Sequence, residues 1–289
     1  MKLSMYAWFV DIVAREGIER AADIARELGC EAVEFIDIYG RESFVLNEEI
    51  AREYREVLAS RGLSVACYSV ATDLIKPDEP DYDSEAALEF LFHGARMAAS
   101  LGSPFLHHTL IRNFRYDEAT YNKNFDAVLE KILPYAVEVA DYCDSLGLTT
   151  LYEPQGLYFN GKERFVEFYG KMKALGKRVG VCGDMGNSLF CDWRPEEFYA
   201  AMIDEIKHVH AKDYIFADSI LDGERIYSSM GGKKIRACPF GEGDVDLGYC
   251  FDLLAGKGYC GAVSLEGEYI DPIEQIERDI KFLRSLEKK

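Results

Sequence analysis

The chain has 289 residues, of which 48% are hydrophobic and 29% charged, a composition typical of a globular domain with a large core. Its 33 basic and 51 acidic residues give a formal net charge of −18, which disfavours nucleic acids and anionic membranes as partners. No segment approaches the ~20 apolar residues of a membrane span, and the eight cysteines form no C-x-x-C pair. We therefore expect free cysteines, a cytoplasmic location and a small-molecule partner.

Short apolar runs alternate along the chain with longer runs of helical period. The apolar start, residues 3–9, predicts a first strand and not a signal peptide, because Asp11 ends it without a cleavage-like site. The predicted strands are 3–9, 32–37, 64–70, 105–110, 149–153, 179–184, 207–212 and 261–266. The predicted helices are 18–28, 48–60, 84–101, 118–146, 162–175, 195–205, 246–257 and 273–286.

Eight such strand-then-helix units predict a (β/α)8 TIM barrel of the α/β class, in which residues 1–289 form a single domain. A doubly wound sheet is the main alternative, but no Gly-rich dinucleotide fingerprint follows any strand. Two long loops, 71–83 and 214–243, follow strand ends, on the face where barrel active sites lie. A homo-oligomer is compatible with the sequence, which leaves the oligomeric state open.

Polar residues end four consecutive predicted strands. Glu153, Asp184, His210 and Glu266 each lie within a residue or two of a strand's carboxyl end, and alternation places three of them opposite an apolar face. Neighbouring barrel strands lie ~4.8 Å apart, so these side chains can share one ion. Any one of them alone is more simply a polar group at the barrel rim, but four at equivalent positions favour a shared site. Three carboxylates and one imidazole suit a divalent cation, Mn²⁺ before Mg²⁺, Co²⁺ or Zn²⁺.

The same segments resemble the xylose isomerase-like barrels, which include the sugar phosphate isomerase/epimerase group. The matching segments are 151–154 (LYEP), 183–187 (GDMGN), 208–213 (HVHAKD), 241–246 (GEGDVD) and 258–266 (GYCGAVSLE). The resemblance covers the whole chain and is densest from 147 to 270. It implies a divalent-metal site made by the four residues above, with Glu153 and Glu266 also acting as the acid/base pair on opposite faces of the substrate. The chain departs from the family's epimerases at Asn187, where they commonly have a histidine that contacts substrate.

Six further residues are candidates for substrate binding: His107, His108, Asn187, Lys212, Trp8 and Arg236. The alternation that turns Leu106 and Leu110 outward turns His107 inward, whereas a twist at the strand end would present His108 instead. The same alternation turns Tyr6, Trp8 and Glu34 inward. For Asp213 we expect either a ligand-orienting role or the closing of a turn, and for Asp244 the cap of the following helix.

The resemblance and the residue types together predict a metal-dependent isomerase or epimerase of a sugar or sugar derivative. The reaction would pass through an enediolate, with the two glutamates moving the proton. A dehydratase acting on a keto-inositol or keto-sugar is the alternative, because an enediolate with a β-hydroxyl can lose it. An abasic-site endonuclease, which needs more histidine ligands and a basic groove, and a sugar-binding barrel without catalysis are remote alternatives.

Overall fold

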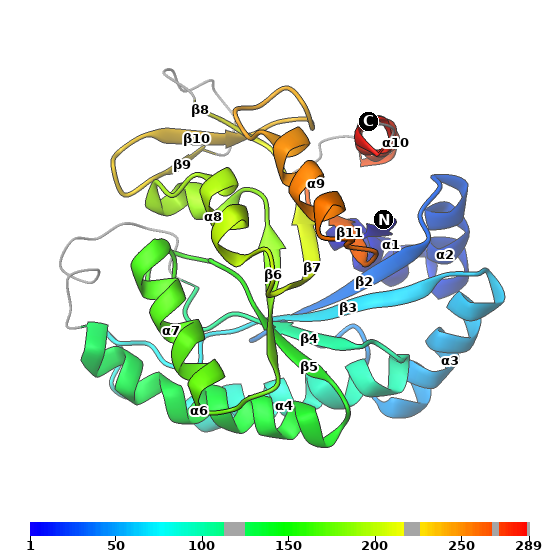
Figure 1. Cartoon of the computed structure of the whole chain (residues 1–289). Coiled ribbons are helices and arrows are strands. Elements are labelled where there is room, and N and C mark those ends of the chain that lie inside the picture. Colours follow the sequence, from blue (N-terminus) through cyan, green and yellow to red (C-terminus); the bar gives the residue numbers. More distant parts are fainter. Residues whose placement is uncertain (113–124, 217–225, 268–271, 288–289) are drawn as a thin grey trace.

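The structure is a computed structural model that describes residues 1–112, 125–216, 226–267 and 272–287 (Figure 1). Eight parallel strands close into one barrel in the order β1-β11-β7-β6-β5-β4-β3-β2, which confirms the predicted single-domain TIM barrel. The strands are β1 (Lys2–Met5), β2 (Ala32–Ile38), β3 (Ser64–Ala71), β4 (Phe105–His108), β5 (Thr149–Tyr152), β6 (Val179–Asp184), β7 (Ile206–Ala211) and β11 (Ala262–Leu265).

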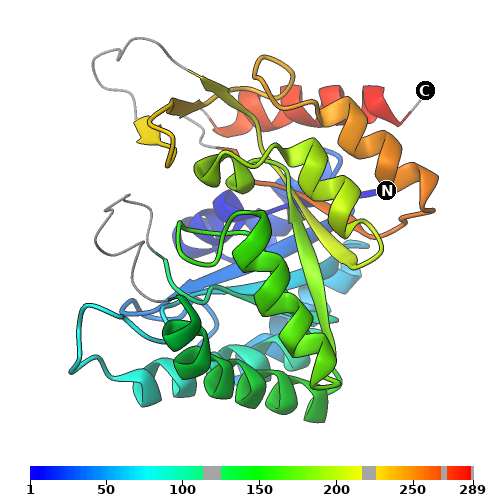
Figure 2. The same cartoon turned by 60° about the vertical axis from the view of Figure 1, so that its left-hand side comes forward.

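Helices surround the barrel on its outside (Figures 1 and 2). They are α1 (Ala7–Glu16), α2 (Ile18–Glu27), α3 (Glu48–Ser60), α4 (Ser84–Leu101), α6 (Phe125–Ser145), α7 (Lys162–Ala174), α8 (Pro195–Met202), α9 (Leu247–Gly256) and α10 (Pro272–Leu286). Residues 118–124, the start of one predicted helix, lie outside the described residues. Among the described residues, no helix has the length and apolar character that crossing a membrane requires.

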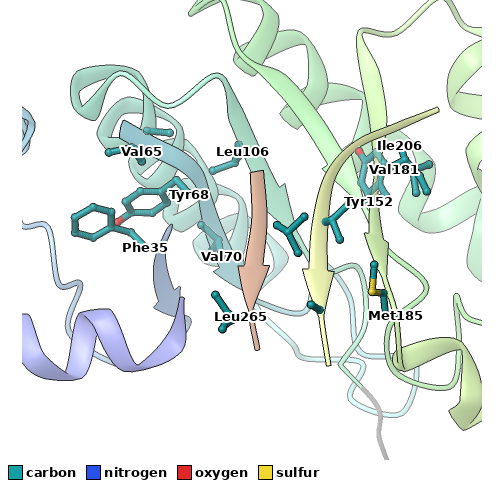
Figure 3. Packing of buried hydrophobic residues seen from close by; sticks show 14 of the residues in the cluster. Phe35, Val65, Tyr68, Val70, Leu106, Tyr152, Val181, Met185, Ile206 and Leu265 are labelled. Atoms are coloured by element: carbon teal, nitrogen blue, oxygen red, sulfur yellow. The ribbon is translucent and has the colours of Figure 1, made fainter. Parts of the chain in front are cut away.

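The two faces of each strand have different environments. Figure 3 shows the outer face, where Phe35, Tyr68 and Leu106 belong to the large core between strands and helices. On the inner face, Cys67, Leu151 and Cys182 form a separate small apolar cluster. Because the inner residues two positions later along these strands are polar, this cluster fills the barrel beneath a polar layer at its carboxyl end.

The first strand is shorter than predicted, which corrects the placement of Trp8. Strand β1 ends at Met5, and helix α1 begins at Ala7, so Trp8 is a half-buried residue of a helix and not an inward residue of a strand. The run from Met5 to Val10 is entirely apolar or aromatic, so alternation could not be distinguished from helical spacing.

The predicted loop 214–243 contains a three-stranded antiparallel sheet that the sequence did not indicate. Its strands are β8 (Tyr214–Phe216), β9 (Ile226–Ser228) and β10 (Lys234–Ala237), in the order β8-β10-β9, and residues 217–225 lie outside the described ones. Asp192, which follows β6, accepts hydrogen bonds from Ser229 Oγ at 2.9 Å and Gly231 N at 2.6 Å. These bonds fix the β9–β10 turn to the carboxyl end of the barrel (Figure 2).

Candidate metal and active site

Four neighbouring strands deliver the predicted ligands to one end of the barrel. Glu153 follows β5, Asp184 ends β6, His210 lies near the end of β7, and Glu266 follows β11, and these strands are adjacent in the order β11-β7-β6-β5. The register pairs Asp184 with His210, and Glu266 N donates to Ala211 O at 2.9 Å. The two glutamates therefore come from the two ends of a four-strand arc.

The side chains of these residues converge on His210 Nδ1. That atom lies 3.1 Å from Glu266 Oε2, 3.2 Å from Glu153 Oε2 and 4.0 Å from Asp184 Oδ2. Neighbouring ligands of an octahedral ion with bonds of about 2.1 Å lie about 3 Å apart, and opposite ones about 4.2 Å. The ligand atoms of Glu153, Asp184 and His210 also lie within 4.8 Å of one another. The donor set and its spacing therefore fit a divalent cation.

The turn after β6 orients Asp184 for this arrangement. Its Oδ1 accepts hydrogen bonds from Gly186 N at 2.7 Å and Asn187 N at 2.6 Å. Its buried Oδ2 receives no hydrogen bond of good geometry among the described residues. A Cβ at Gly186 would lie 2.6 Å from Lys212 Cγ, so only glycine lets this turn approach Lys212. One carboxylate oxygen thus accepts from the backbone, and the other faces His210 and Lys212, where a cation would bind.

Lys212 lies against the same carboxylates. Its buried Nζ is 2.9 Å from Asp184 Oδ2, 3.0 Å from Glu266 Oε1 and 3.1 Å from Asn187 Oδ1. Asn187 in turn donates from Nδ2 to Glu153 Oε1 at 3.2 Å. The predicted candidates Asn187 and Lys212 therefore both lie within the ligand cluster, the group formed by Glu153, Asp184, His210 and Glu266. Lys212 balances part of the negative charge of this cluster.

The two glutamates have different electrostatic environments. Burial, together with the charges of Asp184 and Glu266, raises the pKa of Glu153 to about 7. Burial also disfavours ionised Glu266, but Lys212 and His210 outweigh it and lower the pKa of Glu266 to about 2. Neighbouring carboxyl groups whose pKa values are driven apart are suited to opposite roles as acid and base.

Only one of the two adjacent histidines of β4 faces this site. His107 Nδ1 lies 2.9 Å from Ser69 Oγ, and its buried Nε2 lies 3.7 Å from Glu153 Oε1. His108 packs edge-on against Tyr152, with ring centroids 5.0 Å apart, and its Nδ1 bonds to Thr109 O. Regular alternation thus holds through the end of β4 and directs His108 towards the helices. This position corrects the predicted substrate contact of His108.

Trp8 and Arg236 occupy positions other than those expected of them. Trp8 lies on α1, as described above, while Arg236 lies on β10 of the small sheet, paired in register with Ile215 and Ile226. Their part in substrate binding stays a prediction. One aromatic neighbour of the site is Tyr6, whose ring stacks on His210 at a centroid distance of 4.7 Å.

Sequence reasoning missed Glu34 as a site residue. Glu34 is fully buried beneath the ligand cluster, where His208 Nε2 lies 2.7 Å from its Oε2 and His210 Nε2 lies 3.0 Å from its Oε1. The signal was a carboxylate on the inner face of the apolar strand Ala32–Ile38. Its partners could not be read from the sequence because they are more than 170 residues away.

Asp213 closes a turn, the second of its two predicted roles. Its carboxylate accepts hydrogen bonds from Gly241 N at 2.9 Å, Gly243 N at 3.0 Å and Val245 N at 3.4 Å. A Cβ at Gly243 would collide with this carboxylate, so the glycine is required. The cap of α9 is Asp246, which accepts from Tyr249 N, whereas Asp244 accepts from Phe216 N, which corrects the predicted cap.

Solved structures with this fold include sugar epimerases and a dehydratase. The chain is similar to L-ribulose 3-epimerase, with 14% identity over 99% of this chain and 94% of that chain and a TM-score of 0.73. It is similar to the probable 3-DHS dehydratase of Bacillus anthracis, with 15% identity over 98% of this chain and 99% of that one and a TM-score of 0.72.

A third similar structure is a xylose isomerase-like TIM barrel protein from Mycobacterium smegmatis in complex with magnesium. It has 16% identity over 99% of this chain and 96% of that one, with a TM-score of 0.70. These identities are low, so the three likenesses show the shared fold alone. No curated protein matched the sequence. The family model of the xylose isomerase-like TIM barrel matches residues 22–286, and the chain therefore belongs to that family.

Proposed function

We propose that the protein is a divalent-cation-dependent isomerase or epimerase of a sugar or sugar derivative. The observation that carries this proposal is the convergence of Glu153, Asp184 and Glu266 on His210 Nδ1 at the carboxyl end of the barrel. The epimerases among the solved structures of this fold support the same class of reaction.

The four converging residues would hold the cation, with Mn²⁺ expected before Mg²⁺, Co²⁺ or Zn²⁺ because oxygen ligands dominate. When bound, the cation would stabilise the negative charge that develops on the substrate oxygens as a carbon-bound proton leaves. The buried carboxylates of Glu153 and Asp184 and the partly exposed one of Glu266, with one ammonium nearby, leave an excess of negative charge that a divalent cation offsets.

Glu153 and Glu266 would move the proton. Glu266, whose pKa is lowered, would remove the proton from the carbon beside the substrate carbonyl. Glu153, whose pKa is raised, would return a proton. Because the two residues come from opposite ends of the strand arc, return on the other face inverts the carbon centre. His107 and Asn187 would bind substrate hydroxyl groups.

Dehydration is the second candidate, because Lys212 gives the site a buried ammonium group. After Glu266 has taken the α-proton, Lys212 can donate a proton to a β-hydroxyl. The carbon–oxygen bond then breaks, water leaves, and an enone forms. The dehydratase among the solved structures of this fold supports this alternative.

One experiment distinguishes these reactions. The protein is incubated in D₂O with Mn²⁺ and a panel of ketoses, keto-inositols and keto-glycosides, and the products are followed by NMR and mass spectrometry. Deuterium incorporation at the α-carbon without loss of mass supports the isomerase or epimerase. Loss of water with enone absorbance refutes it in favour of the dehydratase. If no compound of the panel undergoes deuterium exchange and the protein cuts abasic DNA, the result would support the endonuclease.

The acid/base assignment has its own test. Glu266→Gln should leave the fold intact and abolish exchange, because an amide cannot take the proton. Glu242→Gln is the matched control, since Glu242 is exposed and pairs with Arg278 outside the site. Turnover retained in Glu266→Gln would remove Glu266 from proton transfer.

A further inference from the structure

Glu34 lies directly beneath the proposed cation site, on the inner face of β2. Its neighbour Phe35 packs in the core outside the barrel (Figure 3), and alternation therefore turns Glu34 inward. Its carboxylate is fully buried and has three partners: His208 Nε2 at 2.7 Å, His210 Nε2 at 3.0 Å and Ser69 Oγ at 2.7 Å. A buried carboxylate is stable only when its oxygens accept hydrogen bonds, so these contacts hold Glu34 in one position.

The contact between Glu34 and His210 assigns the proton on the imidazole. A carboxylate only accepts hydrogen bonds, so the proton of the His210–Glu34 bond belongs to His210 Nε2. Nδ1 is the atom that faces Glu153 and Glu266, and with a cation bound between these carboxylates His210 would be neutral and carry its lone pair on Nδ1. The stacked Tyr6 ring fixes the plane of the imidazole, so Nδ1 is directed at the position between the carboxylates where a cation would bind.

The same reasoning extends through Ser69 to His107. The Ser69 hydroxyl has one proton, which it donates to Glu34 Oε1. Towards His107 Nδ1, 2.9 Å away, Ser69 Oγ must therefore accept, and the proton lies on Nδ1. Neutral His107 then carries its lone pair on Nε2, a buried atom that has no hydrogen-bond partner among the described residues. This atom can accept a hydrogen bond from a substrate hydroxyl.

We propose that Glu34 is a positioning residue, which sets the tautomers of His210 and, through Ser69, of His107. The inference rests on the proposed function, because it gives His210 Nδ1 to the cation and His107 Nε2 to the substrate. Glu34 itself touches neither. Removing a partner that holds a metal-ligating histidine in one tautomer typically weakens metal binding by 10–100-fold.

A second cation at this depth is the competing interpretation, since Glu34, Cys67 and His208 are close enough to form a ligand group. The 2.7 Å between Glu34 Oε2 and His208 Nε2 is a hydrogen-bond distance. Two ligands of a tetrahedral ion with bonds of about 2.0–2.1 Å lie about 3.3 Å apart. The geometry therefore favours a hydrogen bond over a shared ion.

The first test is the affinity for Mn²⁺, measured by calorimetry on metal-stripped protein. Glu34→Leu removes both carboxylate oxygens, so neither His208 nor His210 keeps its acceptor. We expect Mn²⁺ binding 10–100-fold weaker than in the natural protein. Asp37→Asn is the matched control on the same strand, because Asp37 is a buried carboxylate bonded to Tyr68 OH, away from the site. Its Mn²⁺ affinity should stay within about threefold.

The second test needs no cation and no variant of Glu34. The chain has five histidines, so ¹⁵N-histidine labelling gives a simple spectrum, in which the His107 signal is assigned by its loss in His107→Asn. We expect neutral His107 with its proton on Nδ1.

A third measurement is kinetic: Ser69→Ala should raise KM, while the Mn²⁺ affinity stays unchanged, because His210 keeps its bond to Glu34.

The outcomes separate the two proposals. If the natural protein binds no divalent cation, the proposed function fails, and the ¹⁵N spectrum alone decides the His107 tautomer. If it binds Mn²⁺ and Glu34→Leu binds it equally well, the positioning role of Glu34 is refuted while the proposed function stands. A proton found on His107 Nε2 refutes the link through Ser69. Two Mn²⁺ or Zn²⁺ ions per chain, with one lost in Cys67→Ser, would refute the hydrogen-bond interpretation of Glu34.

Discussion

Replacing Lys212 by methionine removes the one ammonium group described within the ligand cluster. At an effective dielectric constant of 20, charges 2.9–3.0 Å apart attract each other by about 5–6 kcal/mol. Desolvation of the ammonium offsets much of this attraction, so the net value is smaller. Removing one partner of a buried ion pair typically costs about 3–5 kcal/mol, because the remaining charge is left unpaired. For a chain of this length that corresponds to a fall in Tm of about 5–8 °C.

The assay is thermal unfolding of metal-stripped Lys212→Met, with and without Mn²⁺. Because the cation replaces the lost positive charge, we expect Mn²⁺ to raise the Tm of the variant more than that of the natural protein. Lys207→Met is the matched control, since Lys207 is exposed on the same strand, and its free energy of unfolding should change by less than about 0.5 kcal/mol. An unchanged Tm for metal-stripped Lys212→Met would refute the reasoning, and would mean that the carboxyl groups share protons in place of pairing with Lys212.

Two further predictions concern stability. Burial lowers the pKa of His108 to about 4. As the pH falls, the unfolded chain therefore takes up a proton before the folded chain does, and the free energy of unfolding falls by up to about 3 kcal/mol between pH 6.5 and 4. Urea unfolding of His108→Phe should show a weaker pH dependence across that interval, and an unchanged slope would contradict it. Asp213→Ala should cost about 3 kcal/mol, because three backbone N–H groups lose their acceptor. Asp244 is exposed and accepts from a single backbone N–H, so Asp244→Ala should lower the free energy of unfolding by less than about 1 kcal/mol.

The barrel was predictable because each strand-then-helix unit carries its own local signals. Strands β2, β3, β5, β6 and β7 begin and end within a residue of their predicted bounds. The end of strand β1 was not predictable, because the continuation of the strand is apolar at every position and helical and strand periods cannot be separated there. The small sheet was missed because β8 and β9 have three residues each, which is too short for alternation to show.

The candidate site was predictable to the extent that it depends on strand ends. The convergence of the four predicted ligands follows from the fact that parallel strands in a barrel end at the same face. The environment of each ligand does not follow from that rule. Glu34 and His210 are 176 positions apart, and only the closed barrel brings their side chains to 3.0 Å. The choice between His107 and His108 needed the actual course of β4, because a small twist at its end would exchange them.

The segment His208–Asp213 illustrates why the motif identifies the fold better than it identifies the substrate. At a spacing of two, His208, His210 and Lys212 face the barrel interior at three successive depths. His208 bonds to Glu34, His210 lies between Glu34 and the carboxylates, and Lys212 lies above, against Asp184 and Glu266. These contacts are all within the protein, so they constrain the segment whatever substrate is bound. Discrimination between substrates must therefore come from side chains that leave a polar atom free towards the site, and His107 Nε2, which has no hydrogen-bond partner among the described residues, is one such atom.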